Sequence, residues 1–96
     1  MTNKYRIGYD AEQRASHILK GWGYNVIRSA GSKGPFDLIA FNEIQFLLVQ
    51  VKVCPFGKVP SFTTLKNQIK QIPSPDNCEK QLWVWEKYRG WHYFKV

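Results

Sequence analysis

Cysteine is scarce in this sequence, and long apolar runs are absent. The two cysteines, Cys54 and Cys78, form no CxxC pair, and His17 and His92 lie far apart in the chain, so no zinc site is expected. A disulfide stays open, although two cysteines without a secretory leader favour a reduced protein. Apolar runs of at most four residues cannot span a bilayer. We therefore expect a soluble, cytoplasmic protein.

Acidic side chains are also few. The chain has 14 Lys+Arg against 7 Asp+Glu, a formal net charge of +7. Such a surplus attracts polyanions, which makes nucleic acid the first partner to consider and an acidic membrane surface the second. No run of five like charges occurs, so the charge belongs to a folded basic surface and not to a basic tail.

The 96 residues have room for one hydrophobic core, and no linker or repeat divides them, so residues 1–96 are predicted to form a single domain. Apolar spacing predicts a helix over 4–20 and a second one over 62–72 with Ser61 as its N-cap. Strands are predicted at 24–28, 36–41, 46–53, 80–86 and 91–96. This order predicts an α+β fold with a mixed central sheet flanked by two helices.

Three polar residues on two predicted neighbouring strands carry the chemistry. Gln50 and Lys52 are two positions apart on one strand, so their side chains emerge on the same face. Asp37 follows a loop rich in Gly and Ser, and an antiparallel pairing of the two strands can place it beside Gln50. An acid, an amide and an ammonium group would then converge at one end of the hairpin.

This group suits phosphodiester hydrolysis. Carboxylate, amide and backbone carbonyl oxygens can hold Mg²⁺, which acidifies a bound water and offsets charge in the transition state. Lys52 could orient the attacking water or bind the scissile phosphate. Spacing alone is equally compatible with a plain ion pair between Lys52 and Asp37 at the sheet edge.

The stretch GYDAEQRASHILKGWGYNVIRSAGSKGPFDLIA, followed by FLLVQVKV, resembles the PD-(D/E)xK nuclease superfamily, most closely the archaeal-type Holliday junction resolvases. The resemblance covers residues 8–53 and implies a restriction-endonuclease-like αβββαβ core. It also implies Mg²⁺, with Mn²⁺ as a substitute, a DNA substrate and a homodimer. The residues that match the catalytic motif are Glu12, Ser32, Asp37, Gln50 and Lys52.

Two positions depart from the family pattern. Phe36 stands where proline usually precedes the aspartate, with Pro35 one place earlier. Gln50 replaces an acidic residue, and a neutral amide holds Mg²⁺ more weakly than a carboxylate does. The resulting QxK motif resembles that of Mrr-type restriction enzymes. By this similarity Asp37, Gln50, the Val51 carbonyl and Glu12 would hold the metal.

The remaining candidates concern DNA and the subunit interface. Each has a plainer alternative as a loop residue, a helix-surface residue or a solvated lysine. Residues predicted to contact DNA are Ser32, Arg28, Lys33, Lys58 and Lys66, and the Gln68 amide is a candidate to face the site. Aromatic residues expected in the core and the dimer interface are Trp83, Trp85, Trp91, Tyr93 and Phe94.

The sequence therefore predicts a metal-dependent DNA endonuclease, with a Holliday junction resolvase as the first hypothesis. Two alternatives remain: a DNA-binding module that has lost catalysis, marked by Gln50, and a nuclease of the same chemistry that acts on other DNA structures.

Overall fold

Helix α1 (Lys4–Gly21) opens the chain in the computed structural model, which describes residues 4–29 and 35–96. Ala11, Ala15 and Leu19 recur every four residues and form a buried stripe along it. The helix ends in a turn in which Gly23 has a φ of 95°, a left-handed conformation that glycine adopts without strain. The predicted first helix is confirmed.

Five strands form one mixed sheet in the order β1-β2-β3-β4-β5. Every neighbouring pair is antiparallel except β3 and β4, which are parallel and are connected through helix α2 (Thr63–Lys70). The predicted α+β architecture with a mixed sheet is confirmed. The strands are β1 (Asn25–Arg28), β2 (Leu38–Phe41), β3 (Phe46–Cys54), β4 (Cys78–Glu86) and β5 (Gly90–Lys95).

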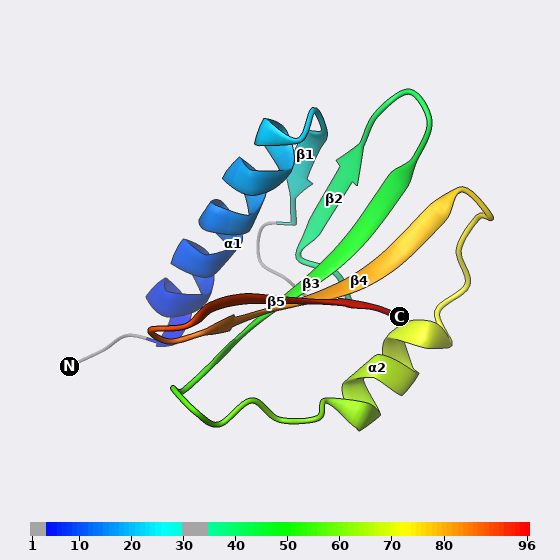
Figure 1. The fold of residues 1–96 in the computed structure, drawn as a ribbon. Helices are drawn as coiled ribbons and strands as arrows, with labels where there is room; N and C mark the ends of the chain where they lie inside the picture. The colour runs from blue at the N-terminus through cyan, green and yellow to red at the C-terminus, as the bar shows by residue number, and fades with distance from the viewer. Residues whose placement is uncertain (1–3, 30–34) are drawn as a thin grey trace.

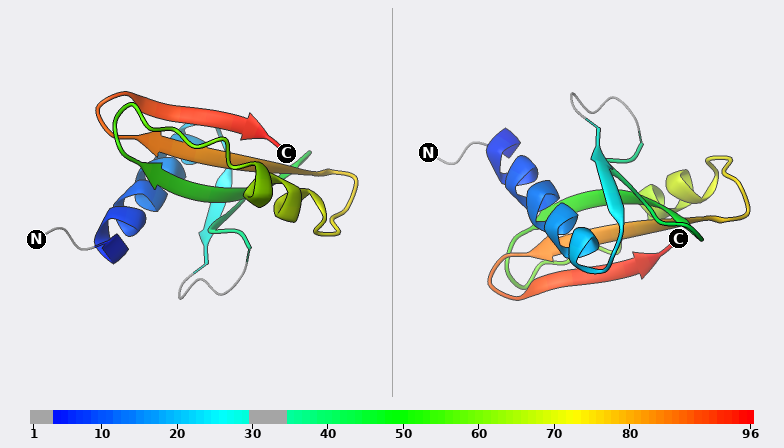
Figure 2. Two further views of the ribbon diagram at one scale, coloured as in Figure 1. Left: turned by 90° about the horizontal axis from the view of Figure 1, so that it is seen from below. Right: turned by 90° about the horizontal axis from the view of Figure 1, so that it is seen from above.

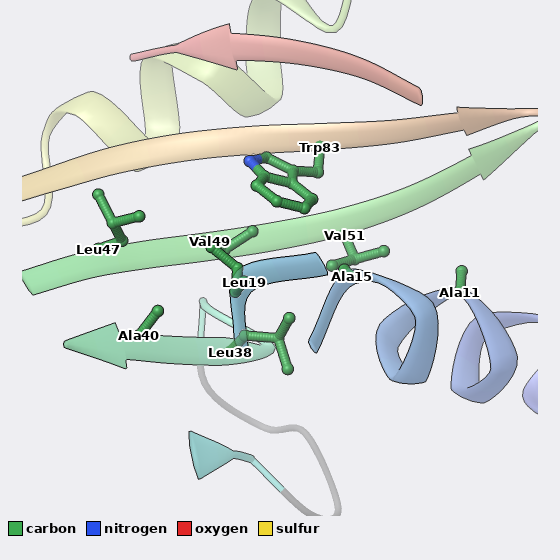
Figure 3. Packing of buried hydrophobic residues seen from close by; sticks show 9 residues of the cluster. All are labelled: Ala11, Ala15, Leu19, Leu38, Ala40, Leu47, Val49, Val51 and Trp83. Atoms are coloured by element: carbon green, nitrogen blue, oxygen red, sulfur yellow. The ribbon is translucent and has the colours of Figure 1, made fainter. Parts of the chain in front are cut away.

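The two helices cover opposite faces of this sheet (Figures 1 and 2). The face under α1 holds the larger core, in which Trp83 and Val49 are fully buried against the helix stripe (Figure 3). On the other face Leu82 and Val84 of β4 form a smaller core with Phe62, at the start of α2. Because α2 covers only part of its face, side chains of β1, β2 and β3 on that face are left partly exposed.

The start of α2 differs from the prediction. Phe62, not Ser61, occupies the N-cap position, with a φ of 55° and no side-chain hydrogen bond to the helix. The Phe62 side chain packs on the smaller core, and burial of an aromatic ring outweighs the capping that Ser61 would supply. The helix also ends at Lys70, so Ile72 lies beyond it.

Both cysteines are free thiols, which answers the question left open by the sequence. Cys78 pairs with Phe46 at one end of the β3–β4 ladder, whereas Cys54 pairs with Glu86 at the other end. A disulfide needs Cα atoms within about 7 Å, which the length of this ladder does not allow. Among the described residues, no helix is long and apolar enough to cross a membrane.

Candidate active site

Asp37 lies where the pairing of β2 with β3 ends. It is 5% exposed, and its backbone N–H donates to the Val49 carbonyl at 2.9 Å. Its carboxylate Oδ2 accepts the Val51 N–H, also at 2.9 Å. The Asp37 side chain thus accepts a β3 backbone N–H at the point where the backbone carbonyls of β2 no longer do so. For this reason β2 begins at Leu38 and not at the predicted residue 36.

Gln50 and Lys52 lie beside Asp37 on the sheet face opposite α1. Leu38 pairs with Val49, and the Asp37 carboxylate accepts the N–H of Val51, the residue between Gln50 and Lys52. Gln50 is half-buried, and Lys52, two positions along the same face, is exposed. The structure therefore places Asp37 next to the segment of β3 that carries Gln50 and Lys52, and a shared role of the three side chains stays a prediction.

Glu12 reaches the same region from helix α1. Its carboxylate Oε1 lies 2.9 Å from Nε of Arg28, at the end of β1, and its side chain is 14% exposed. Burial, and then the negative charge of Asp37, raise the pKa of Glu12, while Arg28 opposes the shift. The influence of Asp37 means that the two carboxylates lie close enough to repel each other.

The oxygen atoms gathered here are of the kind that a hard cation prefers. Asp37 and Glu12 contribute carboxylates, Gln50 an amide and Val51 a backbone carbonyl. In the part of the chain that the structure describes, no group of three or more His, Cys, Asp or Glu side chains could hold a metal ion. The predicted ligand set has only two carboxylates, and a cation would offset both the burial of Glu12 and the charge of Asp37, which together raise the Glu12 pKa.

Arg28, predicted to contact DNA, is held by two neighbours. Besides its ion pair with Glu12, its guanidinium lies 4.5 Å from the centre of the Tyr9 ring. Sequence reasoning missed Tyr9. Tyr9 comes three residues before Glu12, and this spacing, which puts both on the same side of the helix, could have identified it as a neighbour of the site. Arg28 is thus fixed beside the two carboxylates, where it can also balance their charge.

The other predicted DNA contacts are spread over the surface. Lys58 is exposed in the turn after β3, and Lys66 lies on α2 with its Nζ 4.0 Å from the centre of the Phe94 ring. Gln68 is exposed on α2. Ser32 and Lys33 lie outside the described residues, so their predicted roles stay predictions.

The aromatic residues of β4 and β5 divide between core and surface. Trp83 is fully buried, as predicted, with its ring centre 4.6 Å from that of Tyr93. Trp22, which follows α1, also packs on Trp83 and is 57% exposed. Tyr93 is 49% exposed, and its place in a dimer interface stays a prediction.

The chain is similar in sequence to one family of known proteins. The profile of the family described as archaeal Holliday junction resolvase (Hjc) matches residues 3–71. A curated relative, the crossover junction endodeoxyribonuclease Hjc of Methanocaldococcus jannaschii, is 36% identical over 74 residues, which cover 77% of this chain and 53% of the relative. The chain thus spans about half the length of that relative.

A solved structure has a similar fold. It is that of Archaeoglobus fulgidus Hjc, described as a Holliday junction resolvase from an archaeal hyperthermophile. It superposes with a TM-score of 0.69 at 22% sequence identity and covers 88% of this chain and 72% of its own. At this identity the comparison establishes the fold, which agrees with the restriction-endonuclease-like core expected from the sequence.

Proposed function

The chain belongs to the archaeal Holliday junction resolvase family, and from this premise we propose that it is a metal-dependent endonuclease that hydrolyses phosphodiester bonds in branched DNA. The proposal is supported by the hydrogen bond from the Val51 N–H to the Asp37 carboxylate, which lies next to the strand segment of Gln50 and Lys52, and by the closeness of Glu12 to Asp37. A junction between four DNA arms is the substrate we assign to it.

The proposed cofactor is Mg²⁺, for which Mn²⁺ can substitute. Asp37, Gln50, the Val51 carbonyl and Glu12 would hold it. A bound divalent cation would acidify a water molecule and offset charge on the phosphate in the transition state. The support for this ligand set is its chemistry: two carboxylates that repel each other, next to neutral oxygen donors.

Lys52 has the role of the catalytic cation in this proposal. Its exposed ammonium group stands on the same face as Gln50, beside the buried side chains of Leu82 and Val84 on β4. An ammonium on that surface can bind a non-bridging phosphate oxygen or orient the attacking water. Asp37 and Glu12 would hold the cation, and Lys52 would add a second positive charge near the reacting phosphate.

We also propose that the enzyme acts as a homodimer, because two sites related by a two-fold axis can cut opposing strands of a symmetric junction. The sheet face that carries the site continues into apolar residues that α2 leaves uncovered. Ile27 is 55%, Ile39 36% and Phe46 41% exposed, and Ile27 and Ile39 pair across β1 and β2. A second copy packed on this face would bring the two sites near each other.

One observation favours a second candidate, a DNA-binding module without catalysis: Gln50 removes an anionic ligand from the site. A nuclease specific for another DNA structure is a further alternative. The test incubates the protein with four-way junction, flap, linear duplex and single-stranded DNA, with Mg²⁺, with Mn²⁺ and with EDTA. We expect metal-dependent nicks at the junction. Binding without cutting would favour the inactive module, and preferred cutting of flap or duplex DNA would contradict the proposed substrate.

A further inference from the structure

Two turns lie together at one end of the sheet, just beyond the last residues of β3 and β4. The first, 55–58, follows β3 and is closed by a hydrogen bond from the Lys58 N–H to the Pro55 carbonyl at 3.2 Å. The second, 86–89, links β4 to β5. The Lys87 N–H of this turn donates to the Cys54 carbonyl at 3.1 Å, which ties the two turns together. Both lie at the end of the sheet opposite the turn between β2 and β3 (Figure 1).

Glu86 fixes the two turns to each other. Its side chain is 3% exposed, and its Oε2 accepts the Gly57 N–H at 2.8 Å while its Oε1 lies 2.7 Å from His92 Nε2. Arg89 Nε approaches Oε2 to 3.5 Å. The Gly57 and His92 hydrogen bonds lower the pKa of Glu86, so it stays ionised at neutral pH.

The outer surface of these turns combines aromatic rings with basic groups. Phe56 is 53% and Tyr88 81% exposed, with ring centres 6.3 Å apart. Lys87 Nζ lies 5.3 Å from the centre of the Tyr88 ring, and the Arg89 guanidinium 5.1 Å from that of Phe56. We call the exposed residues of both turns the double-turn tip: Phe56, Lys58, Lys87, Tyr88 and Arg89.

The backbone of Tyr88 sets this residue apart. Its φ is 69°, in the left-handed region where Gly and Asn are favoured and a bulky residue is strained. Because the Tyr88 side chain is 81% exposed, burial of its ring stabilises the fold too little to offset the backbone strain. A strained and exposed aromatic residue at a turn is the kind of feature that serves binding more than folding.

We propose that the double-turn tip binds unpaired bases of the DNA substrate, with Tyr88 and Phe56 stacking on bases and Lys58, Lys87 and Arg89 contacting phosphates. Exposed aromatic residues set among cations are how proteins hold single-stranded nucleic acid, since every base has a stacking face. The inference rests on the proposed function, because it assumes that DNA occupies the site, and it adds a second contact that recognises opened base pairs.

The path of β3 gives the spacing between site and tip. Phe56 comes four positions after Lys52, a span of at most roughly 14 Å in an extended strand. This distance corresponds to about four nucleotides along one DNA strand. The tip would therefore contact bases within a few nucleotides of the scissile phosphate, where the arms of a junction open.

The test compares Tyr88→Gly with Ile44→Ala. Ile44 is 83% exposed at the turn between β2 and β3, far from the tip along the sheet, and serves as a matched control. Glycine tolerates the backbone of residue 88, so the fold and the melting temperature should not suffer. Binding is measured by fluorescence anisotropy in EDTA, with a four-way junction, a single-stranded oligonucleotide and a continuous duplex, over a range of salt concentrations.

We expect Tyr88→Gly to weaken binding to the single strand and to the junction by about 5- to 100-fold, with little effect on the duplex. The salt dependence should be unchanged, because stacking releases no counterions. Lys58→Gln should instead lower the slope of log K against log salt by about 0.7 to 0.9. Ile44→Ala should bind every DNA like the parent protein.

Three results would overturn the proposal. If Tyr88→Gly binds the single strand and the junction like the parent protein, the double-turn tip does not bind DNA. The proposed nuclease function would be unaffected by this result. A changed oligomeric state of Tyr88→Gly in sedimentation velocity would assign the tip to contact between two copies of the chain. Failure of the parent protein to bind any of the three DNAs would contradict both this proposal and the proposed function.

Discussion

The two buried carboxylates of this sheet have opposite surroundings. Glu86 meets a backbone N–H, an imidazole and a guanidinium, and its pKa is lowered. Asp37 lies near a second carboxylate, Glu12, whose pKa is raised in part by the charge of Asp37. The first arrangement stabilises a fold, whereas the second brings two like charges near each other, with Arg28 bound to one of them. Clustered like charges of this kind are typical of functional sites.

The strongest test of this contrast exchanges the acid for its amide at each place. Asp37→Asn should reduce cleavage by about 10³-fold, because an anionic ligand of the proposed metal ion is lost. Asn can still accept the Val51 N–H, so the melting temperature should stay close to that of the parent. Cleavage rates under single-turnover conditions and thermal melts check both parts. An Asp37→Asn variant that cleaves like the parent protein would contradict the claim that Asp37 serves catalysis and Glu86 serves stability.

Glu86→Gln should show the reverse behaviour. We expect a lower melting temperature at neutral pH, because the ionised acceptor for Gly57, His92 and Arg89 is lost, and only a small change in the cleavage rate of the folded fraction. The folded-state pKa of Glu86 is lowered, so its contribution is present above the unfolded pKa of about 4.3 and is lost as pH falls through the folded-state value. Melting curves of parent and variant should converge in acid. A constant difference at all pH values would contradict this assignment.

Glu12→Gln should separate stability from activity within the site. The raised pKa means that the charged form is disfavoured in the folded state, so removal of the charge should leave the melting temperature at pH 7 unchanged or slightly higher. Cleavage should fall by about 10- to 100-fold, less than for Asp37→Asn. A clearly lower melting temperature would show that the ion pair with Arg28 outweighs the repulsion from Asp37.

Gln50→Glu should have the smallest effect. The variant restores the acidic residue typical of the superfamily, so we expect activity to be retained and the metal concentration for half-maximal cleavage to fall a few-fold. Titration of the cleavage rate with Mg²⁺ measures this shift. Loss of activity would mean that the amide of Gln50 has a specific role that a carboxylate cannot fill.

Of the surroundings of Asp37 and Glu86, those of Asp37 were the easier to predict from the sequence. The alternation of side chains along a strand places Gln50 and Lys52 on one face, and the short turn predicted the antiparallel pair of β2 and β3, because both features are local in the sequence. The pairing of Glu12 with Arg28 also depends on how α1 lies on the sheet, which spacing does not determine. The catalytic role of Glu12 came from family resemblance.

The surroundings of Glu86 could not be predicted. They require the parallel register of β3 and β4, which brings Gly57 to a residue 29 positions later in the chain. The start of α2 was missed for a similar reason. Its N-terminus is determined by the packing of Phe62 on a core that forms between distant strands, and Ser61 gave a local signal for a different boundary.

The central claim is that the residues at the end of the β2–β3 ladder cut DNA, and Lys52→Ala tests it most directly. Lys95→Ala is the control, since Lys95 is also an exposed lysine on a strand of the same sheet. With a four-way junction and Mg²⁺, Lys52→Ala should lose cleavage while its binding in EDTA stays close to that of the parent, and Lys95→Ala should retain both. If Lys52→Ala cuts the junction as fast as the parent protein, the assigned active site is wrong.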